Sequence, residues 1–274
     1  MHAPELNRSQ TPSPEQLDPR TLQFYHQSMD VLRDAGVPYL VGGAYSLAHY
    51  AQIVRHTKDF DVFVSKSDVQ RALDAFEKAG YSTEKVFPHW LAKAFRPKSE
   101  DFVDVIYGSG NGLCPVTQDW FEHAVDGTAL GRPAKLVAAE EIIWTKSFIQ
   151  ERERFDGADV AHLIRACGKR MDWKRLVGHF TGHEQVLLAH LILFTYIYPA
   201  DREVVPGEVL DSLYQRVRNE PPAKEKLLRG TFISREQYLS DLRDHGYIDA
   251  RIEPRGPMKA ADVAHWTAAI GTIK

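Results

Sequence analysis

The sequence predicts an α+β protein, in which a mixed β-sheet flanked by helices is followed by an all-α C-terminal half. Between residues 19 and 107, stretches with helical spacing alternate with short β-branched runs, which is the pattern of a sheet covered by helices. Beyond Gly131, the apolar residues recur at helical spacing alone. We therefore expect a flexible tail over residues 1–18, a mixed α/β domain over residues 19–130 and a helical domain over residues 131–274.

The elements of the N-terminal half follow from apolar spacing and from the residues that end each element. Leu22, Tyr25, Met29 and Leu32 share one helical face, and Gly36 is placed to end that helix. The next run is Val-Pro-Tyr-Leu-Val, a strand whose proline falls near its start, where a missing N–H is tolerated. The expected order is a helix at 19–35, a strand at 37–41, a helix at 44–53, a strand at 58–64, a helix at 67–79 and a strand at 103–107.

The C-terminal half is predicted to contain only helices. We expect a long helical stretch over residues 138–167, broken at Gly157, and then helices at 173–180, 184–198, 207–219 and 235–245. The most apolar run, residues 186–200, is interrupted by His190 and is shorter than the roughly 20 residues that a membrane span requires. This run is predicted to be a buried helix.

Composition narrows the functional classes. The formal net charge is −3, so the protein as a whole does not have the electrostatics of a nucleic-acid binder. Its two cysteines, Cys114 and Cys167, lie far apart without CxxC spacing, which predicts buried thiols in a reducing compartment. Residues 1–16 are polar, contain three prolines and have no apolar segment of the kind found in signal peptides. We expect a cytoplasmic protein that makes no contact with a membrane.

Two carboxylates two residues apart are the most informative chemical signal. Asp59 and Asp61 stand in the run Thr-Lys-Asp-Phe-Asp-Val-Phe-Val, and side chains at i and i+2 of a strand point to the same face. Like charges at this distance repel each other unless a cation lies between them. Mg²⁺ (or Mn²⁺) is the expected cation, because it binds carboxylate oxygens together with substrate phosphates. The Gly42-Gly43 turn lets phosphate approach the backbone, so the combination predicts phosphoryl or nucleotidyl transfer.

The ordered combination resembles a known superfamily. An apolar strand, Gly-Gly, a helix, Asp-x-Asp on a strand and a third carboxylate on a later strand are similar to the nucleotidyltransferases of the DNA-polymerase-β type. Within that superfamily, the Gly-Gly-Ala start and the run Arg55-x-Thr57-x-Asp59-x-Asp61 most resemble small bacterial nucleotidyltransferases related to the AbiEii toxins. The resemblance spans residues 37–165.

The resemblance implies a role for each matching residue. Gly42 and Gly43 would hold a nucleoside triphosphate by backbone contact. Asp59 and Asp61 would bind the metal ions, joined by Asp104 as the third carboxylate. Asp104 would also help to ionise the acceptor hydroxyl.

Asp101 competes with Asp104 for the place of the third carboxylate, since both stand in the run Asp-Phe-Val-Asp-Val-Ile. Asp104 has apolar residues on both sides, and a buried carboxylate needs a partner. Asp101 lies at the edge of the predicted strand, where water can solvate it. We therefore favour Asp104 and keep Asp101 as the alternative.

Three cations are candidates for contacting the phosphates. Arg55 and Lys58 flank the carboxylate pair, and for both a solvated loop is the alternative. Lys146 lies in the mostly apolar run Ile-Ile-Trp-Thr-Lys-Ser-Phe, so it either snorkels to solvent or reaches an anion. In similar nucleotidyltransferases, a helical lysine at this place reaches the triphosphate.

Arg152 and Asp156 are four residues apart, and we expect them to form an ion pair on a helix.

The predicted function is Mg²⁺-dependent transfer of a nucleoside monophosphate from a nucleoside triphosphate to an acceptor hydroxyl, with release of pyrophosphate. The acceptor is left open between an RNA such as tRNA, a protein and a small molecule such as an aminoglycoside. A catalytically silent nucleotide-binding or interaction module on the same fold is the alternative. A toxin that pairs with an antitoxin partner is a third hypothesis.

Two further patterns are interpreted as structural. His179 and His183 are four residues apart, but Gly182 interrupts the helix and no acidic residue has matching spacing, so no zinc site is expected. The basic residues over 216–235 are interspersed with glutamates and are expected to form a solvated surface rather than an RNA-binding face.

Overall fold

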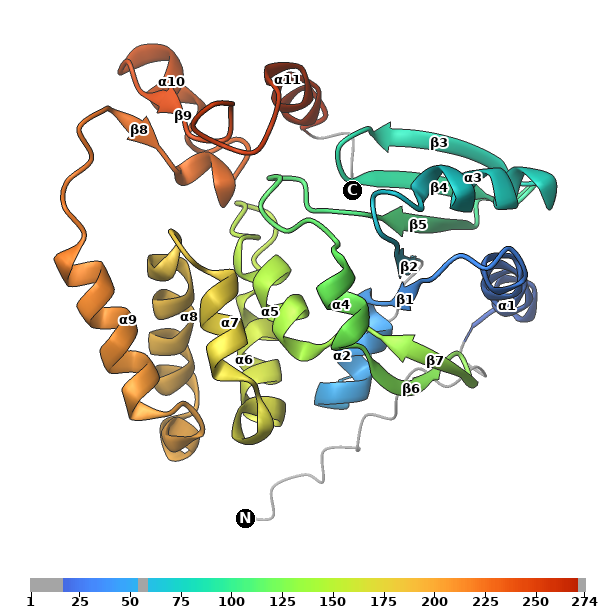
Figure 1. Cartoon of the computed structure of the whole chain (residues 1–274), viewed down its shortest axis with the longest axis horizontal. Helices are drawn as coiled ribbons and strands as arrows, with labels where there is room; N and C mark the ends of the chain where they lie inside the picture. The colour runs from blue at the N-terminus through green and yellow to red at the C-terminus, as the bar shows by residue number, and fades with distance from the viewer. Residues whose placement is uncertain (1–16, 54–58, 271–274) are drawn as a thin grey trace, which may run out of the picture.

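The computed structural model describes residues 17–53 and 59–270, and a seven-stranded mixed sheet lies beside a layer of helices (Figure 1). The strands are β1 (Leu40–Val41), β2 (Phe60–Phe63), β3 (Ser82–Phe87), β4 (Leu91–Phe95), β5 (Phe102–Ile106), β6 (Val125–Ala129), β7 (Arg132–Leu136), β8 (Leu227–Leu228) and β9 (Ile248–Asp249). The helices are α1 (Pro19–Asp34), α2 (Gly43–Ala51), α3 (Val69–Lys78), α4 (Gln118–Glu122), α5 (Ala139–Ser147), α6 (Gly157–Cys167), α7 (Trp173–His179), α8 (Glu184–Ile197), α9 (Gly207–Asn219), α10 (Leu239–Asp244) and α11 (Ala260–Ala268).

The large sheet has the strand order β3-β4-β5-β2-β1-β7-β6. At its centre, β2 runs parallel to β5 and antiparallel to β1, which in turn runs parallel to β7. The hairpins β3–β4 and β6–β7 extend the two edges. The strands that carry the predicted carboxylates, β2 and β5, are therefore direct neighbours.

Alternation along the central strands gives the sheet two different faces. Phe60 and Val62 of β2 and Val103 of β5 are fully buried in a hydrophobic cluster with α1 and α3. The residues between them point to the other side, because successive side chains of a strand alternate. We call this second side the open face. Its partly buried members on β2, β4 and β5 are Asp61, Phe63, Lys93, Phe102, Asp104 and Ile106.

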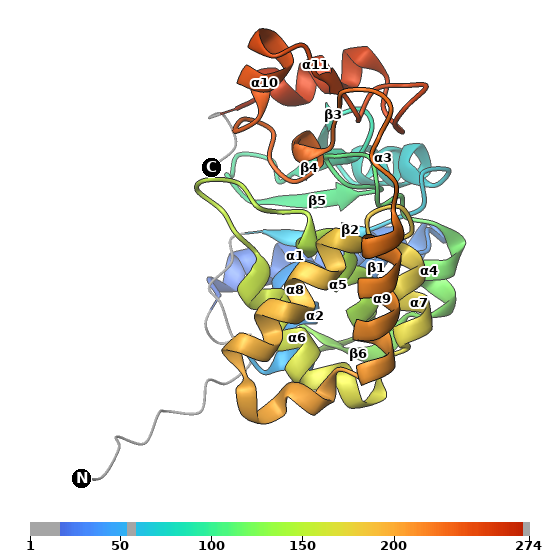
Figure 2. The ribbon, with the colours of Figure 1, turned by 90° about the vertical axis from the view of Figure 1, so that its left-hand side faces the viewer.

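A second hydrophobic cluster joins α2 and α4 to the helical half of the chain (Figure 2). Each helix from α4 to α9 contributes at least one buried apolar residue to it. Representative members are Leu47, Trp120, Ile143, Leu163, Leu176, Leu191 and Leu213. Of the helices that follow the sheet in the sequence, α5 and α6 pack directly on α2, the helix that begins at the Gly-Gly turn.

The C-terminal segment after α9 returns to the sheet, where α11 lies beside β3 (Figure 1). Trp266 of α11 packs edge-on against Phe87 and Trp90, with ring centroids 4.8 and 5.3 Å away. Asn111, in the loop after β5, donates from Nδ2 to the carbonyl oxygen of Phe232 at 2.9 Å. The last fifty residues thus connect the helical half to the hairpin end of the sheet.

The predicted α+β class is confirmed, with local differences that have physical reasons. The stretch expected as a single broken helix over 138–167 forms two helices, because α5 ends at Ser147 and Gly157 begins α6 rather than interrupting a helix. The expected strand at 37–41 is reduced to Leu40–Val41, and the helix expected at 235–245 to Leu239–Asp244. The sheet also includes β7, which lies beyond the boundary expected near residue 130. Within residues 17–53 and 59–270, no helix has the length and apolar character needed to cross a bilayer.

Candidate active site

Neighbouring strands place two carboxylates side by side on the open face. Asp61 of β2 and Asp104 of β5 are register partners in a parallel pair, and paired strands lie only about 4.8 Å apart. Asp59 stands directly before β2, and its charge raises the pKa of both Asp61 and Asp104. All three predicted carboxylates are therefore within electrostatic reach of one another.

The carboxylates of the open face are shifted toward protonation. Burial, followed by the charges of Asp104 and Asp59, raises the pKa of Asp61 to about 7. Burial also raises the pKa of Asp104 above its ordinary value, although Lys93 opposes the shift. The positive charge near these carboxylates does not offset their burial and mutual repulsion, which is the electrostatic condition for binding a divalent cation. Their oxygens are the hard ligands that Mg²⁺ or Mn²⁺ prefers, so the donor set fits this metal.

The Gly42-Gly43 turn packs directly against these strands. A Cβ on Gly42 would collide with the ring of Phe63, and a Cβ on Gly43 would collide with the carboxylate of Asp61. Gly43 has φ +56° and begins α2, while the N–H of Gly42 donates to the carbonyl oxygen of Asp61 at 3.0 Å. The two glycines thus let the N-terminus of α2 approach the carboxylate of Asp61.

The contact with Asp61 predicts that Gly43→Ala is more destabilising than an alanine at another glycine with the same backbone conformation. Gly36 is the matched control, since it has φ +63° and a Cβ there would meet nothing within 4 Å. We expect Gly36→Ala to cost about 1–2 kcal/mol from backbone strain alone. Gly43→Ala should cost about 1–3 kcal/mol more from the collision. Urea unfolding of both variants measures the difference, and equal losses would show that Gly43 makes no tight contact with Asp61.

Lys93 of β4 is a site residue that the sequence analysis missed. It lies opposite Asp104 in the antiparallel β4–β5 pair, with Nζ 2.8 Å from Asp104 Oδ1 and 3.5 Å from the ring centroid of Phe102. The alternating run Leu-Ala-Lys-Ala-Phe is a strand signal that would have found it. Lys93 therefore holds Asp104 in place and favours its ionised form.

Lys146 reaches anions of its own chain. Its Nζ lies 2.7 Å from Asp156 Oδ2 and 2.8 Å from Asp159 Oδ2, and only 15% of its side chain is exposed. Its charge lowers the pKa of Asp61, so α5 presents it toward the open face. Lys146 therefore reaches an anion and does not snorkel to solvent. Its contact with a phosphate remains a prediction.

The expected helical ion pair between Arg152 and Asp156 is wrong. Residues 148–156 lie between α5 and α6, and the Nε of Arg152 lies 3.6 Å from Glu153 Oε1 instead. Arg154 takes the place of Arg152 and donates from Nε and Nη2 to the two oxygens of Asp156, both at 3.0 Å. The side chain of Arg154 is 64% exposed and its charge lowers the pKa of Asp61, which makes it a further cation near the open face.

Asp101 lies outside the group of facing carboxylates and has a structural set of contacts. It accepts hydrogen bonds from Thr21 Oγ1 at 3.0 Å, from Ser99 Oγ at 2.8 Å and from Arg96 Nη1 at 3.1 Å. These contacts tie the start of α1 to the β4–β5 turn. Asp104, the register partner of Asp61, is therefore the better candidate for the third carboxylate.

Two of the cations named from the sequence, Arg55 and Lys58, lie outside the described residues. Tyr45 of α2, which the sequence analysis did not single out, is buried, and its hydroxyl has no hydrogen-bond partner within the described ranges. Burial, with the charges of Asp61 and Asp59, raises the pKa of Tyr45, so it is a neutral donor beside the carboxylates.

One family model matches part of the chain. Residues 25–97 match the model of the aminoglycoside-2''-adenylyltransferase family. The matched segment runs from α1 through β4 and contains the Gly42-Gly43 turn, Asp59 and Asp61. No curated protein matches the chain.

Solved structures with similar folds include antibiotic-modifying enzymes. The solution structure of the antibiotic-resistance factor ANT(2'')-Ia has 16% sequence identity and a TM-score of 0.42, over 64% of this chain and 98% of that chain. The lincosamide antibiotic adenylyltransferase LnuA has 14% identity and a TM-score of 0.36, over 52% and 94% of the two chains. A nucleotidyltransferase-like protein from Paracoccidioides brasiliensis has 14% identity and a TM-score of 0.41, over 69% and 95%. The matching family and LnuA are named as adenylyltransferases, and the Paracoccidioides brasiliensis protein is named as nucleotidyltransferase-like.

Proposed function

We propose that the protein is a divalent-metal-dependent nucleotidyltransferase that transfers a nucleoside monophosphate from a nucleoside triphosphate to a hydroxyl of a small molecule. The observation that carries the proposal is the register pair of Asp61 and Asp104 on the open face, with Gly43 and the N-terminus of α2 against Asp61. Exposed backbone N–H groups at a helix N-terminus bind phosphate, and adjacent carboxylates bind the cation that accompanies it.

Each residue of the site has a proposed task. Asp59, Asp61 and Asp104 hold Mg²⁺ or Mn²⁺, which when bound neutralises charge on the phosphates of the nucleotide. The start of α2 at Gly42 and Gly43 positions the phosphate chain. Asp104, whose ionised form Lys93 favours from 2.8 Å, accepts the proton of the acceptor hydroxyl.

The cations around the open face supply the remaining phosphate contacts. Arg154 is proposed as the more available of the two described cations, because its side chain is 64% exposed whereas that of Lys146 is 15% exposed. Lys146 bridges Asp156 and Asp159, and it would contribute its charge from that position. Arg55 and Lys58 stay candidates for phosphate contacts because they flank the carboxylate pair in the sequence.

The small-molecule acceptor is proposed from the family match over residues 25–97, since that family is named for aminoglycoside adenylylation. Transfer to tRNA or to a protein hydroxyl, the AbiEii-like subtype and pairing with an antitoxin rest on the sequence resemblance alone. A cytoplasmic location remains part of the proposal.

Transfer of label to a panel of acceptors tests this function. Each α-labelled nucleoside triphosphate is incubated with the protein, Mg²⁺ and, in separate reactions, aminoglycosides, a lincosamide, total RNA and bulk protein. We expect label in a small-molecule product. Label in the RNA or protein fraction instead would contradict the proposed acceptor class, and nucleotide binding without any transfer would favour the catalytically silent module.

A further inference from the structure

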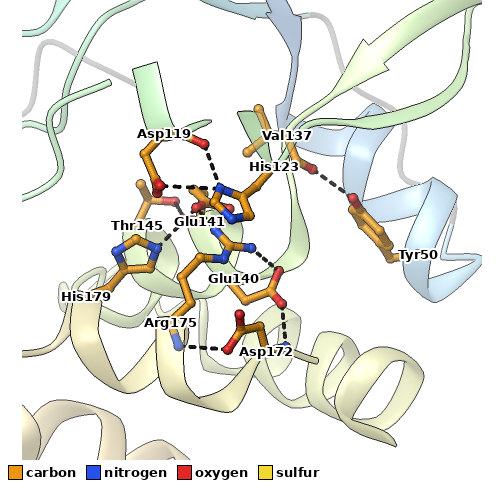
Figure 3. Close-up of polar contacts among 10 residues, drawn as sticks. All are labelled: Tyr50, Asp119, His123, Val137, Glu140, Glu141, Thr145, Asp172, Arg175 and His179. Carbon is orange, nitrogen blue, oxygen red and sulfur yellow. Dashed lines mark hydrogen bonds and ion pairs between the residues drawn. The ribbon is translucent and has the colours of Figure 1, made fainter. Parts of the chain in front are cut away.

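Three helices bring a second group of metal-ligand side chains together away from the strands of the open face (Figure 3). Asp119 comes from α4, Glu141 from α5 and His179 from α7, and each offers one ligand atom within 4.8 Å of the other two. Because the three residues are far apart in the sequence, the group exists only in the folded chain. None of them belongs to β2, β4 or β5.

Glu141 carries a buried oxygen atom that lacks a partner. Its side chain is 0% exposed. Oε1 accepts a hydrogen bond from Arg175 Nη1 and lies 3.1 Å from His179 Nε2. Oε2 is buried and has no hydrogen-bond partner among the described residues. A carboxylate oxygen removed from water requires a donor or a cation, so the structure leaves one ligand position of Glu141 unused.

The charge around Glu141 is not balanced by the protein alone. Arg175 spans Glu140 and Glu141, with Nη2 2.8 Å from Glu140 Oε2, and Asp119 adds a third carboxylate (Figure 3). The group therefore contains three carboxylates and one guanidinium, which leaves an excess of two negative charges while the histidines are neutral. A divalent cation would cancel that excess.

The imidazole of His179 is held in a fixed orientation. Its ring stacks flat on Trp144, with centroids 4.4 Å apart and an interplanar angle of 4°. Asp119 is at the surface, with 47% of its side chain exposed and Oδ1 3.3 Å from His123 Nδ1. An oriented imidazole and a buried carboxylate on the inside, with a half-exposed carboxylate at the solvent edge, give a cation a route of entry.

We propose that Asp119, Glu141 and His179 form a structural binding site for a divalent transition-metal ion, for which Zn²⁺ is the best match. One imidazole and two carboxylates make a mixed nitrogen and oxygen set, which suits Zn²⁺ better than Mg²⁺. Water would complete the coordination shell. The ion links α4, which follows the sheet strand β5, to α5 and α7 of the helical half. The proposal departs from the sequence expectation of no zinc site, which considered His179 together with His183. The ligands proposed here come from three elements and share no short spacing.

Zinc binding by untagged, metal-stripped full-length protein tests the proposal. All variants are made in an Asp61→Asn background, which weakens metal binding at the open face. We expect the parent to retain one more Zn²⁺ per chain after gel filtration than Asp119→Ala does. A Zn²⁺ concentration 100-fold above the dissociation constant should raise the melting temperature of the parent by about 5 °C.

The control variant is Asp126→Ala, which removes an exposed carboxylate that pairs with Lys135 at 2.9 Å in the β6–β7 hairpin. It should keep both the zinc content and the thermal shift of the parent. Equal zinc content and equal shifts in the parent and in Asp119→Ala would overturn the proposal and leave the group as an ion-pair network around Arg175. The readouts do not depend on nucleotidyl transfer, so this result is independent of the proposed activity.

Discussion

Asp61→Asn is expected to lower nucleotidyl transfer by at least about a thousandfold and, in the absence of metal, to stabilise the fold above pH 7. Each 1.4 kcal/mol of lost charge stabilisation costs about a factor of ten in rate, and a metal ligand contributes several such units. Steady-state turnover with saturating Mg²⁺ and nucleotide measures the first effect. Undiminished turnover in the purified variant would show that Asp61 is not a metal ligand.

The stability effect has a definite pH window. The pKa of Asp61 is raised to about 7 in the folded protein, whereas an unfolded chain has an aspartate pKa of about 3.9. The folded state therefore disfavours ionisation, and the wild type loses stability as the pH rises from about 4 to about 7. The Asp61→Asn variant should gain no stability below pH 4 and about 1–3 kcal/mol above pH 7. This gain is smaller than the free energy that corresponds to the full pKa shift, because the side chain is partly exposed. Urea unfolding in a chelator at pH 4 and pH 8, beside Asp126→Asn as an exposed control, decides whether the gain appears only at the higher pH.

Lys93→Met is expected to slow transfer at neutral pH by about ten- to a hundredfold and to restore most of the rate at high pH. Lys93 is the cation that lowers the pKa of Asp104, so its loss should raise that pKa further. A larger fraction of Asp104 is then protonated at pH 7 and cannot accept the proton of the acceptor. The measurement is the acid limb of the rate profile between pH 5 and pH 9.

The conservative variant separates the two roles that Lys93 can have. Lys93→Arg keeps a cation beside Asp104 and should retain the acid limb of the wild type. If Lys93→Met lowered the rate by the same factor at every pH, Lys93 would act only as a packing residue on the open face. Because the ion pair is partly buried, Lys93→Met should also cost about 1–3 kcal/mol of stability.

The fold was predictable where local patterns decide it. The helical face of Leu22, Tyr25, Met29 and Leu32 indicated α1, and the β-branched run at Phe60–Phe63 indicated β2. The hairpins β3–β4 and β6–β7 were not predicted. Strands β3, β6 and β7 are polar and largely exposed and carry little periodic signal, whereas the alternating run of β4 was overlooked. The segment between α5 and α6 was included in the helical stretch predicted over 138–167, and Arg152 was paired with Asp156 by helical spacing. Arg154 and Lys146 instead bind Asp156, in a tertiary arrangement that spacing cannot reveal.

The sequence indicated the strands on which the candidate site lies. Asp61 and Asp104, both named from the sequence, are register partners on β2 and β5, whereas Asp59 stands just before β2 and not within it. The sequence did not indicate that Lys93 faces Asp104, since that contact depends on cross-strand register, nor that Gly43 yields space to the carboxylate of Asp61. The group around Glu141 was missed for the same reason, because three helices supply it.

Parallel reactions with α-labelled and γ-labelled ATP, each with Mg²⁺ and the acceptor that gave label in the panel, test the central claim most directly. We expect the α label to enter the product and the γ label to leave as pyrophosphate in equal amount. Asp61→Asn should abolish both. Entry of the γ label into the product, or equal turnover in a chelator, would contradict the assignment of the open face as a metal-dependent nucleotidyl-transfer site.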